Sequence, residues 1–199
     1  MSKPSSTARS VSTNWASATP PRSRSGTNVA AELAEALRIL GAGKPRLLGY
    51  ADARVPQSAP GRPRFCDAPL DESVRRLVTH IREFRPDIVV THDAYGGLPG
   101  HPDHVHTHRV TVLAAQAAGL GQLYPDAGAP WQPQALYLAT HPHSAVPALR
   151  DVIGARKAAY SVPDEQVTAT VDVGPWLAIE WYIRHTLVTT APARTELTA

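Results

Sequence analysis

The sequence predicts one α/β domain built on a parallel β-sheet with helices on both faces. Three observations predict this class. Short apolar, β-branched segments alternate with segments whose apolar residues recur at helical spacing. Helix and strand follow one another in regular order, and this order favours parallel strands joined by helices. The length of 199 residues is sufficient for one domain with an ordinary core.

Apolar residues at helical spacing predict the helices. Leu33, Leu37 and Leu40 recur at i, i+4 and i+7, which predicts a helix over 29–40. A helix over 71–84 carries the apolar stripe Val74, Leu77, Val78, Ile81 and Phe84. Further helices are predicted over 105–118, 146–152 and 175–187.

Short apolar segments predict strands at 46–50, 86–91, 135–140 and 167–173. The segment 52–70 holds five prolines and reads as a loop. This loop is longer than most connections, and long loops are typical of functional segments or lids.

The composition limits the classes of function. The net charge is +3, the isoelectric point is about 9.2, and much of the excess charge lies before Glu32. A nucleic-acid partner is not expected, because only 6% of residues are aromatic. No apolar run approaches the roughly 20 residues of a membrane span. The single Cys66 suits a reducing compartment, and we expect a cytoplasmic protein.

The chain divides into three parts by composition. Residues 1–28 are rich in Ser, Thr, Pro and Arg without apolar periodicity, which predicts a disordered leader. Residues 29–187 hold the predicted elements and form the expected domain. Residues 188–199 are expected to be a disordered tail.

Histidines gather between the predicted strand 86–91 and the helix that follows. Within Gly96–His108 the sequence places His101, Asp103, His104, His106 and His108. In an α/β sheet this is where ligands bind, beyond the carboxyl ends of the strands. If the helix begins near Pro102, His104 and His108 share one face, and His101 lies in the preceding glycine-rich loop. Asp103 is well placed for the N-terminus of that helix.

This residue set favours a metal site. Neutral imidazole suits zinc, and hydrolytic zinc sites usually have three protein ligands and one position for water. From the residues alone, a solvated loop with a capping aspartate remains the alternative. An all-histidine site from His104, His108, His141 and His143 is a further one.

Five segments resemble the PIG-L/LmbE-like zinc deacetylases, and cover roughly residues 29–180. They are Glu32–Gly41, Leu48–Asp52, Arg85–Thr91, Gly96-Gly97 and Gly100–His104. The most specific is His-Pro-Asp-His within a strand, glycine loop and helix. The branch is similar to the mycothiol-pathway enzymes that remove acetyl from N-acetylglucosaminyl-inositol.

The resemblance implies a Rossmann-like fold, one divalent metal, usually Zn²⁺, and a small N-acetyl amino-sugar substrate. His104 matches the metal-binding histidine of the family. His101 matches the catalytic histidine that protonates or stabilises the tetrahedral intermediate, and Asp103 matches the carboxylate that orients this histidine. Asp52 lies where the family has a substrate-contacting aspartate.

One departure from the family pattern is large. The family's first strand ends in Ala-His-Pro-Asp-Asp, which supplies two further metal ligands and the general base, and this motif does not occur in the sequence. We therefore expect a truncated chain with impaired activity, in which the first strand or strands of the sheet are missing. A sheet edge exposed in this way favours self-association.

Two other functions stay open from the sequence. The first is a non-catalytic remnant or interaction module of the same fold. The second is an amidase that acts on a mycothiol-type conjugate. A dinucleotide-binding protein is disfavoured, because no Gly-x-Gly-x-x-Gly motif follows a first strand.

Overall fold

The computed structural model describes residues 26–39, 41–98, 100–153, 159–173 and 178–185. The helices are α1 (Gly26–Ile39), α2 (Leu70–Phe84), α3 (Pro102–Ala117) and α4 (Val146–Ile153). The strands are β1 (Ile88–His92), β2 (Ala135–Thr140), β3 (Ala169–Val173) and β4 (Ala178–His185). Most of the leader and all of the tail predicted from the sequence lie outside the described residues. The helix α1 starts at Gly26, three residues before its predicted start.

The described strands form one four-stranded sheet in the order β1-β2-β4-β3. β1 and β2 run parallel, with Ile88 opposite Ala135. β4 runs antiparallel to both β2 and β3. The predicted α/β class is confirmed, and the parallel pairing within this sheet is that of β1 with β2.

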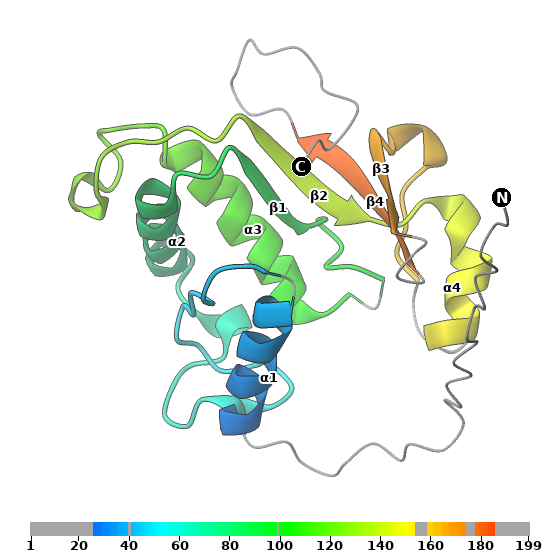
Figure 1. Cartoon of the computed structure of the whole chain (residues 1–199), viewed down its shortest axis with the longest axis horizontal. Coiled ribbons are helices and arrows are strands. Elements are labelled where there is room, and N and C mark those ends of the chain that lie inside the picture. The colour runs from blue at the N-terminus through cyan, green and yellow to red at the C-terminus, as the bar shows by residue number, and fades with distance from the viewer. Residues whose placement is uncertain (1–25, 40, 99, 154–158, 174–177, 186–199) are drawn as a thin grey trace, which may run out of the picture.

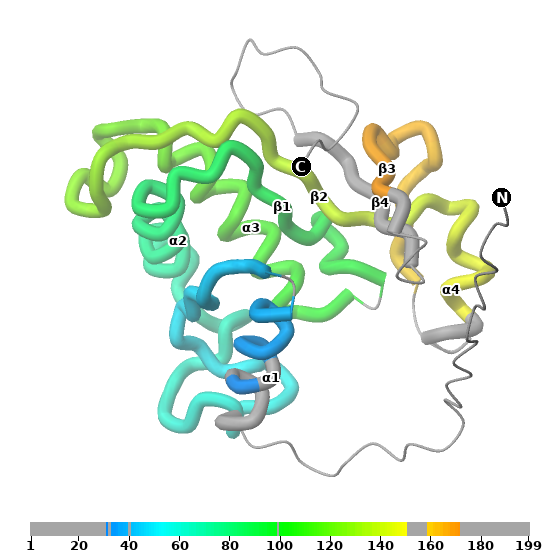
Figure 2. The backbone as a smooth tube through the Cα atoms, viewed as in Figure 1, coloured from blue at the N-terminus to red at the C-terminus, as the bar shows by residue number. Residues whose placement is uncertain are grey.

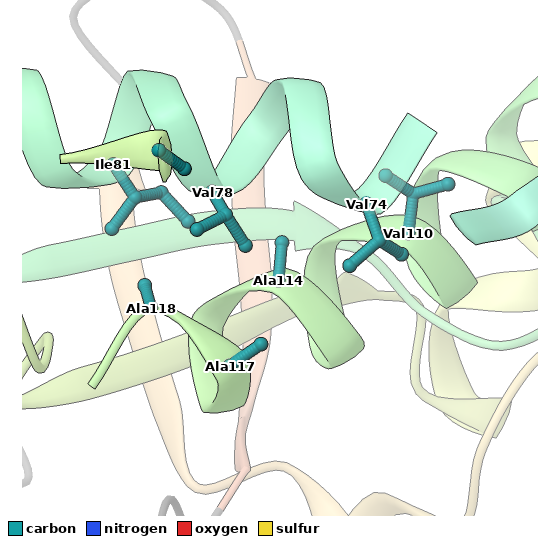
Figure 3. Close-up of a cluster of buried hydrophobic side chains, with 8 residues drawn as sticks. Val74, Val78, Ile81, Val110, Ala114, Ala117 and Ala118 are labelled. Atoms are coloured by element: carbon teal, nitrogen blue, oxygen red, sulfur yellow. The ribbon is translucent and has the colours of Figure 1, made fainter. Parts of the chain in front are cut away.

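α3 lies on one face of the parallel pair, and α2 lies beside α3 (Figure 1). α3 packs on the sheet through a small cluster of Ala115, Leu136 and Leu138, with Val89 and Val112 beside it. α2 packs against α3, and Val78 and Ala114 are fully buried between the two helices (Figure 3). A fully buried valine side chain contributes roughly 1.5–3 kcal/mol, so this interface fixes α3 and the residues at its N-terminus.

The opposite face of β1 is open in the described part of the chain. Ile88 and Val90 point away from α3 and are exposed to 38% and 51%. β1 also lies at one edge of the described sheet. The sequence predicts helices on both faces of the sheet. Among the described residues, helices cover only the face of β1 that contacts α3.

Two predicted elements are wrong. The predicted terminal helix over 175–187 is the strand β4 where it is described. Its Trp181, Tyr182 and Ile183 are of residue types that favour strands. Trp181 and Tyr182 pair with both β2 and β3, and Ile183 pairs with Leu138 of β2. The predicted strand 46–50 is also absent, because this segment has no partner strand among the described residues. Only an isolated bridge between Ala51 and Arg64 follows it.

The segment between α1 and α2 folds back against the start of α3 (Figure 2). It contains two short 3₁₀ helices, η1 (Pro56–Ser58) and η2 (Phe65–Asp67). Phe65 N–H donates to Ala51 O at 2.8 Å, and Ala51 N–H donates to Pro63 O at 2.9 Å. These bonds close the segment into a loop that brings Asp52 next to α3. A search of the described helices for one long and apolar enough to cross a membrane found none.

Candidate active site

The site begins where β1 ends, and Asp93 shapes the turn that follows. This carboxylate is 3% exposed. Its Oδ1 accepts hydrogen bonds from the N–H groups of Tyr95 and Gly97, at 3.1 and 3.2 Å. Its Oδ2 accepts from Thr140 Oγ1 at 2.7 Å. Asp93 therefore ties the glycine-rich loop to the ends of both parallel strands. Asp93 was not among the site residues predicted from the sequence, although an aspartate four residues before Gly97 is a turn signal.

Gly96 allows the loop to lie directly on α3. Its φ of +77° belongs to the left-handed region, which residues other than glycine rarely adopt. A Cβ at this position would lie 2.7 Å from Val105 Cγ2 and 2.8 Å from Val105 N. The close approach places the Gly96 carbonyl beside the first turn of the helix.

His101 caps the N-terminus of α3. Its backbone is extended, with φ −68° and ψ 130°, and Pro102 follows at the first helical position, as predicted. The ring Nδ1 accepts a hydrogen bond from Asp103 N–H at 3.2 Å. An accepting Nδ1 carries no proton, so the neutral ring carries its proton on Nε2. His101 is thus arranged as a hydrogen-bond donor through Nε2.

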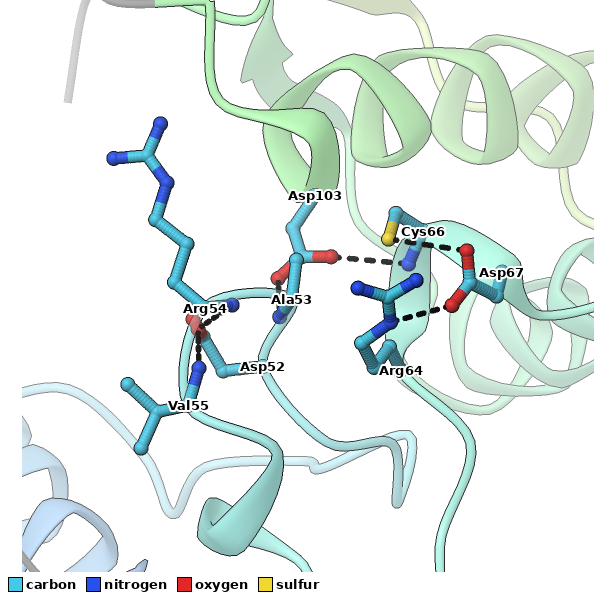
Figure 4. A network of polar contacts seen from close by, with 8 residues as sticks. All are labelled: Asp52, Ala53, Arg54, Val55, Arg64, Cys66, Asp67 and Asp103. Atoms are coloured by element: carbon cyan, nitrogen blue, oxygen red, sulfur yellow. Dashed lines mark hydrogen bonds and ion pairs between the residues drawn. The ribbon is translucent and has the colours of Figure 1, made fainter.

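Asp103 connects the helix to the loop of residues 51–67. Its Oδ2 accepts from Ala53 N–H at 2.8 Å, and its Oδ1 accepts from Cys66 N–H at 3.0 Å (Figure 4). The contact with His101 runs through the backbone N–H of Asp103 and not through its carboxylate. The carboxylate therefore holds the loop in place against the helix N-terminus.

Asp52 lies in this loop and comes close to the helix N-terminus. Its Oδ1 accepts from the N–H groups of Arg54 and Val55, at 2.7 and 2.9 Å (Figure 4). One ligand atom from each of Asp52, His101 and Asp103 lies within 4.8 Å of the other two. The structure thus brings together three of the four site residues predicted from the sequence. Residues 52 and 101 meet because Asp103 bonds the loop.

His104, the fourth predicted residue, lies beside this group. Its ring Nδ1 is 3.2 Å from Gly96 O. Because a carbonyl can only accept, Nδ1 carries the proton and Nε2 keeps its lone pair. The ring stacks face to face on His92, with centroids 3.9 Å apart and planes 4° from parallel. Its centroid is 4.9 Å from that of His101.

The surroundings of His104 favour its neutral form. Partial burial lowers its pKa most, and the positive charge that His101 can carry lowers it further. Neutral imidazole is the form that binds metal ions.

The other histidines of the cluster point elsewhere. His106 is buried with its ring edge-on to Phe65, at 4.7 Å between centroids. His108 Nδ1 lies 2.9 Å from the backbone oxygen of His92, and His143 Nδ1 lies 2.8 Å from Ser161 Oγ. We searched the described part of the chain for three or more His, Cys, Asp or Glu residues whose ligand atoms lie within 4.8 Å of one another. The group found is Asp52, His101 and Asp103. The alternative all-histidine site is therefore not formed there.

The donor set at the site fits a zinc ion. Imidazole nitrogen and carboxylate oxygen are both zinc ligands. A histidine that binds zinc usually donates its other ring N–H to a carbonyl or carboxylate. His104 has this arrangement, with Nδ1 directed at Gly96 O.

A cavity of about 420 Å³ opens beside the site. Its walls are mainly apolar and include Leu48, Tyr50 and Phe65, while Asp52 and Asp103 line its polar part. The cavity gives a small molecule access to the two carboxylates.

The family model for PIG-L, described as GlcNAc-PI de-N-acetylase, matches residues 8–115, which is more than half of the chain. The chain belongs to this family. The match begins within the segment predicted as a leader and ends within α3.

Two similar proteins carry the name 1D-myo-inositol 2-acetamido-2-deoxy-alpha-D-glucopyranoside deacetylase. The protein of Rhodococcus jostii (strain RHA1) is 41% identical over 183 residues, which cover 83% of this chain and 62% of the relative. The protein of Mycobacterium leprae (strain Br4923) is 45% identical over 118 residues, which cover 53% of this chain and 37% of the relative. The chain thus spans about three fifths of the length of the Rhodococcus relative.

A solved structure is also similar: the N,N'-diacetylchitobiose deacetylase from Pyrococcus horikoshii complexed with its inhibitor MPG. The TM-score is 0.48 at 18% sequence identity, over 74% of this chain and 44% of that one.

Proposed function

We propose that this chain carries a zinc-dependent N-deacetylase site for an N-acetylated amino sugar or its inositol conjugate. The observation that carries the proposal is the meeting of Asp52, His101 and Asp103 beside His104, at the carboxyl end of β1. Membership of the PIG-L family and the names of the similar bacterial enzymes support the same reaction.

We assign His104 as the residue that holds the metal, through Nε2. The chemistry that zinc supplies when bound is Lewis acidity, which polarises an amide carbonyl and makes hydroxide accessible near neutral pH. Gly96 O supports His104 by accepting the Nδ1 proton, which keeps the lone pair on Nε2.

His101 is the proton donor in this proposal. Its Nδ1 is occupied by Asp103 N–H, so its Nε2–H is available to an amide oxygen that gains negative charge or to the departing amine nitrogen. Asp103 fixes the loop, and through the loop it fixes Asp52. We assign Asp52 Oδ2 to a hydroxyl of the sugar, because Oδ1 already accepts two backbone N–H groups.

We expect slow turnover. The sequence contains no Ala-His-Pro-Asp-Asp motif, to which the resemblance assigned two metal ligands and the general base. We also place the reaction in the cytoplasm, which the single cysteine supports.

The test is deacetylation by the purified chain with added zinc. The substrate is 1D-myo-inositol 2-acetamido-2-deoxy-alpha-D-glucopyranoside, and the free amine is measured with fluorescamine. We expect release of amine that falls by about 10²-fold or more in His101→Ala, the usual effect of losing a general acid. The control is His143→Ala, which changes an exposed histidine bonded to Ser161.

Two results would contradict the proposal. One is the absence of amine release at any zinc concentration, which favours a non-catalytic module. The other is equal turnover in the wild type and His101→Ala. Release of amine only from a larger mycothiol-type conjugate would assign the same site to an amidase and would refute the acetyl-sugar substrate.

A further inference from the structure

His92 has no role in the reaction proposed above, yet its ring covers one face of the His104 ring. The two centroids are 3.9 Å apart and the planes differ by 4°. His92 is the last residue of β1, and His104 is in the first turn of α3. The stacked pair thus joins the sheet to the helix at the candidate site.

The position of His92 is fixed from two sides. On the sheet side, it pairs with Ala139 of β2, and the next residue, Asp93, donates its N–H to Ala139 O at 3.1 Å. On the helix side, His108 Nδ1 donates to the backbone oxygen of His92 at 2.9 Å. These contacts hold the backbone of His92, from which its ring extends over the His104 ring.

The stacked geometry shows what His92 does not do. The lone pair of an imidazole nitrogen lies in the plane of the ring. Since the two planes are nearly parallel and 3.9 Å separates the ring centroids, the lone pairs of His92 and His104 lie in separate planes and cannot both point at one ion. In this arrangement His92 is not a second ligand for an ion bound by His104.

We propose that His92 is a positioning residue that holds the imidazole of His104 in its metal-binding orientation. This inference rests on the proposed function, which makes His104 the metal ligand. Two contacts define the orientation of that ring. The hydrogen bond from Nδ1 to Gly96 O fixes the edge of the ring, and the stack on His92 fixes its plane.

In this proposal His92 orients the His104 ring through the flat face of its own ring and not through its nitrogen atoms. An alanine at position 92 would leave one face of His104 without a neighbour, so the ring could turn about its side-chain torsions and lose the bond to Gly96 O. A phenylalanine would keep a flat aromatic surface of similar thickness and would remove both ring nitrogens. The pair His92→Ala and His92→Phe therefore separates the stacking surface from the nitrogen atoms.

The first experiment measures zinc affinity of the full chain by competition with a chromophoric chelator. We expect His92→Ala to weaken binding about tenfold or more, the usual effect of losing a residue that supports a metal ligand. We expect His92→Phe to bind zinc as tightly as the wild type within about threefold. Cooperative thermal unfolding of each variant shows that it is folded, and His143→Ala is the matched control.

A second measurement needs no metal. Nitrogen-15 NMR of the His104 ring in the zinc-free chain reports which nitrogen carries the proton. We expect the Nδ1-protonated form in the wild type and in His92→Phe, and a mixture of both forms in folded His92→Ala.

The inference is overturned if folded His92→Ala keeps both the wild-type affinity and the wild-type ring protonation. It is also overturned if His92→Phe binds zinc as weakly as His92→Ala, since an imidazole nitrogen would then be required. His104→Ala distinguishes these results from a failure of the proposed function. If its zinc affinity equals that of the wild type, the assignment of His104 as the metal ligand is wrong.

Discussion

At the scale of single residues, Asp103 controls the site through the backbone that it holds. Its two carboxylate oxygens accept from Ala53 N–H and Cys66 N–H, fifty and thirty-seven residues away in sequence. Its own N–H is bound by His101 Nδ1. One aspartate thereby links the helix cap, the loop and Asp52.

Replacing Asp103 by alanine should release the loop. Hydrogen bonds to a charged group contribute about 1.5–3 kcal/mol each in general, and Asp103 is partly buried, so we expect a loss of about 1–3 kcal/mol in the free energy of unfolding. Hydrogen exchange should show lower protection of the Ala53 and Cys66 amides. The control is Asp67→Ala, which removes an exposed carboxylate from the same loop and should leave these amides protected. Equal protection in Asp103→Ala and wild type would show that the carboxylate does not anchor the loop.

Three of the four predicted site residues could be located from sequence because they lie in one short motif, and Asp52 was located through the family resemblance. His101, Asp103 and His104 fall in a single turn, and the proline between them sets the start of the helix. His92 and Asp93 could not be assigned in the same way. Their roles come from contacts with His104 and Thr140, which lie 12 and 47 residues further along the chain.

At the scale of elements, the contact between α2 and α3 depends on a buried cation as well as on apolar residues. Arg82 is 3% exposed. Its guanidinium donates to six backbone carbonyls around the C-terminus of α3 and the loop beyond it. These belong to Ala117, Ala118, Leu120, Leu123, Tyr124 and Gly128. A positive charge is favoured at this end of a helix.

Replacing Arg82 by methionine should leave these carbonyls without their donor in a buried place. We expect the free energy of unfolding in urea to fall by about 3 kcal/mol or more. Arg75→Met is the matched control on the same helix, because Arg75 is exposed and bonds Asp126 at the surface. If the two variants lose the same stability, the buried carbonyl network is not what holds the end of α3.

The apolar stripe of α2 was predicted from sequence, and Val74, Val78 and Ile81 are indeed buried. The last residue of the predicted stripe, Phe84, is 69% exposed, so the prediction was wrong at the end of the helix. The burial of Arg82 on the same helix could not be predicted, since it depends on carbonyls of another helix and a loop. The identity of β4 was missed for a similar reason. Its strand form depends on β2 and β3 on either side, and the pattern over 175–187 did not show these partners.

At the scale of the whole molecule, the described sheet, α3 and the loop of residues 51–67 all contribute residues around His104. The parallel pair and α3 place His104 at the strand ends, and the loop adds Asp52. β1 remains at the edge of the described sheet, with Ile88 and Val90 exposed on the face away from α3. Self-association through this edge stays a prediction.

The proposed function depends on His104 as the residue that binds zinc, and a zinc-edge anomalous difference map from crystals grown with zinc tests this assignment most directly. We predict a peak at about 2.0–2.1 Å from His104 Nε2, the usual zinc–nitrogen bond length. A zinc peak with no His104 contact, whether among Asp52, His101 and Asp103 or beside His143, would contradict the assignment of His104 as the metal ligand.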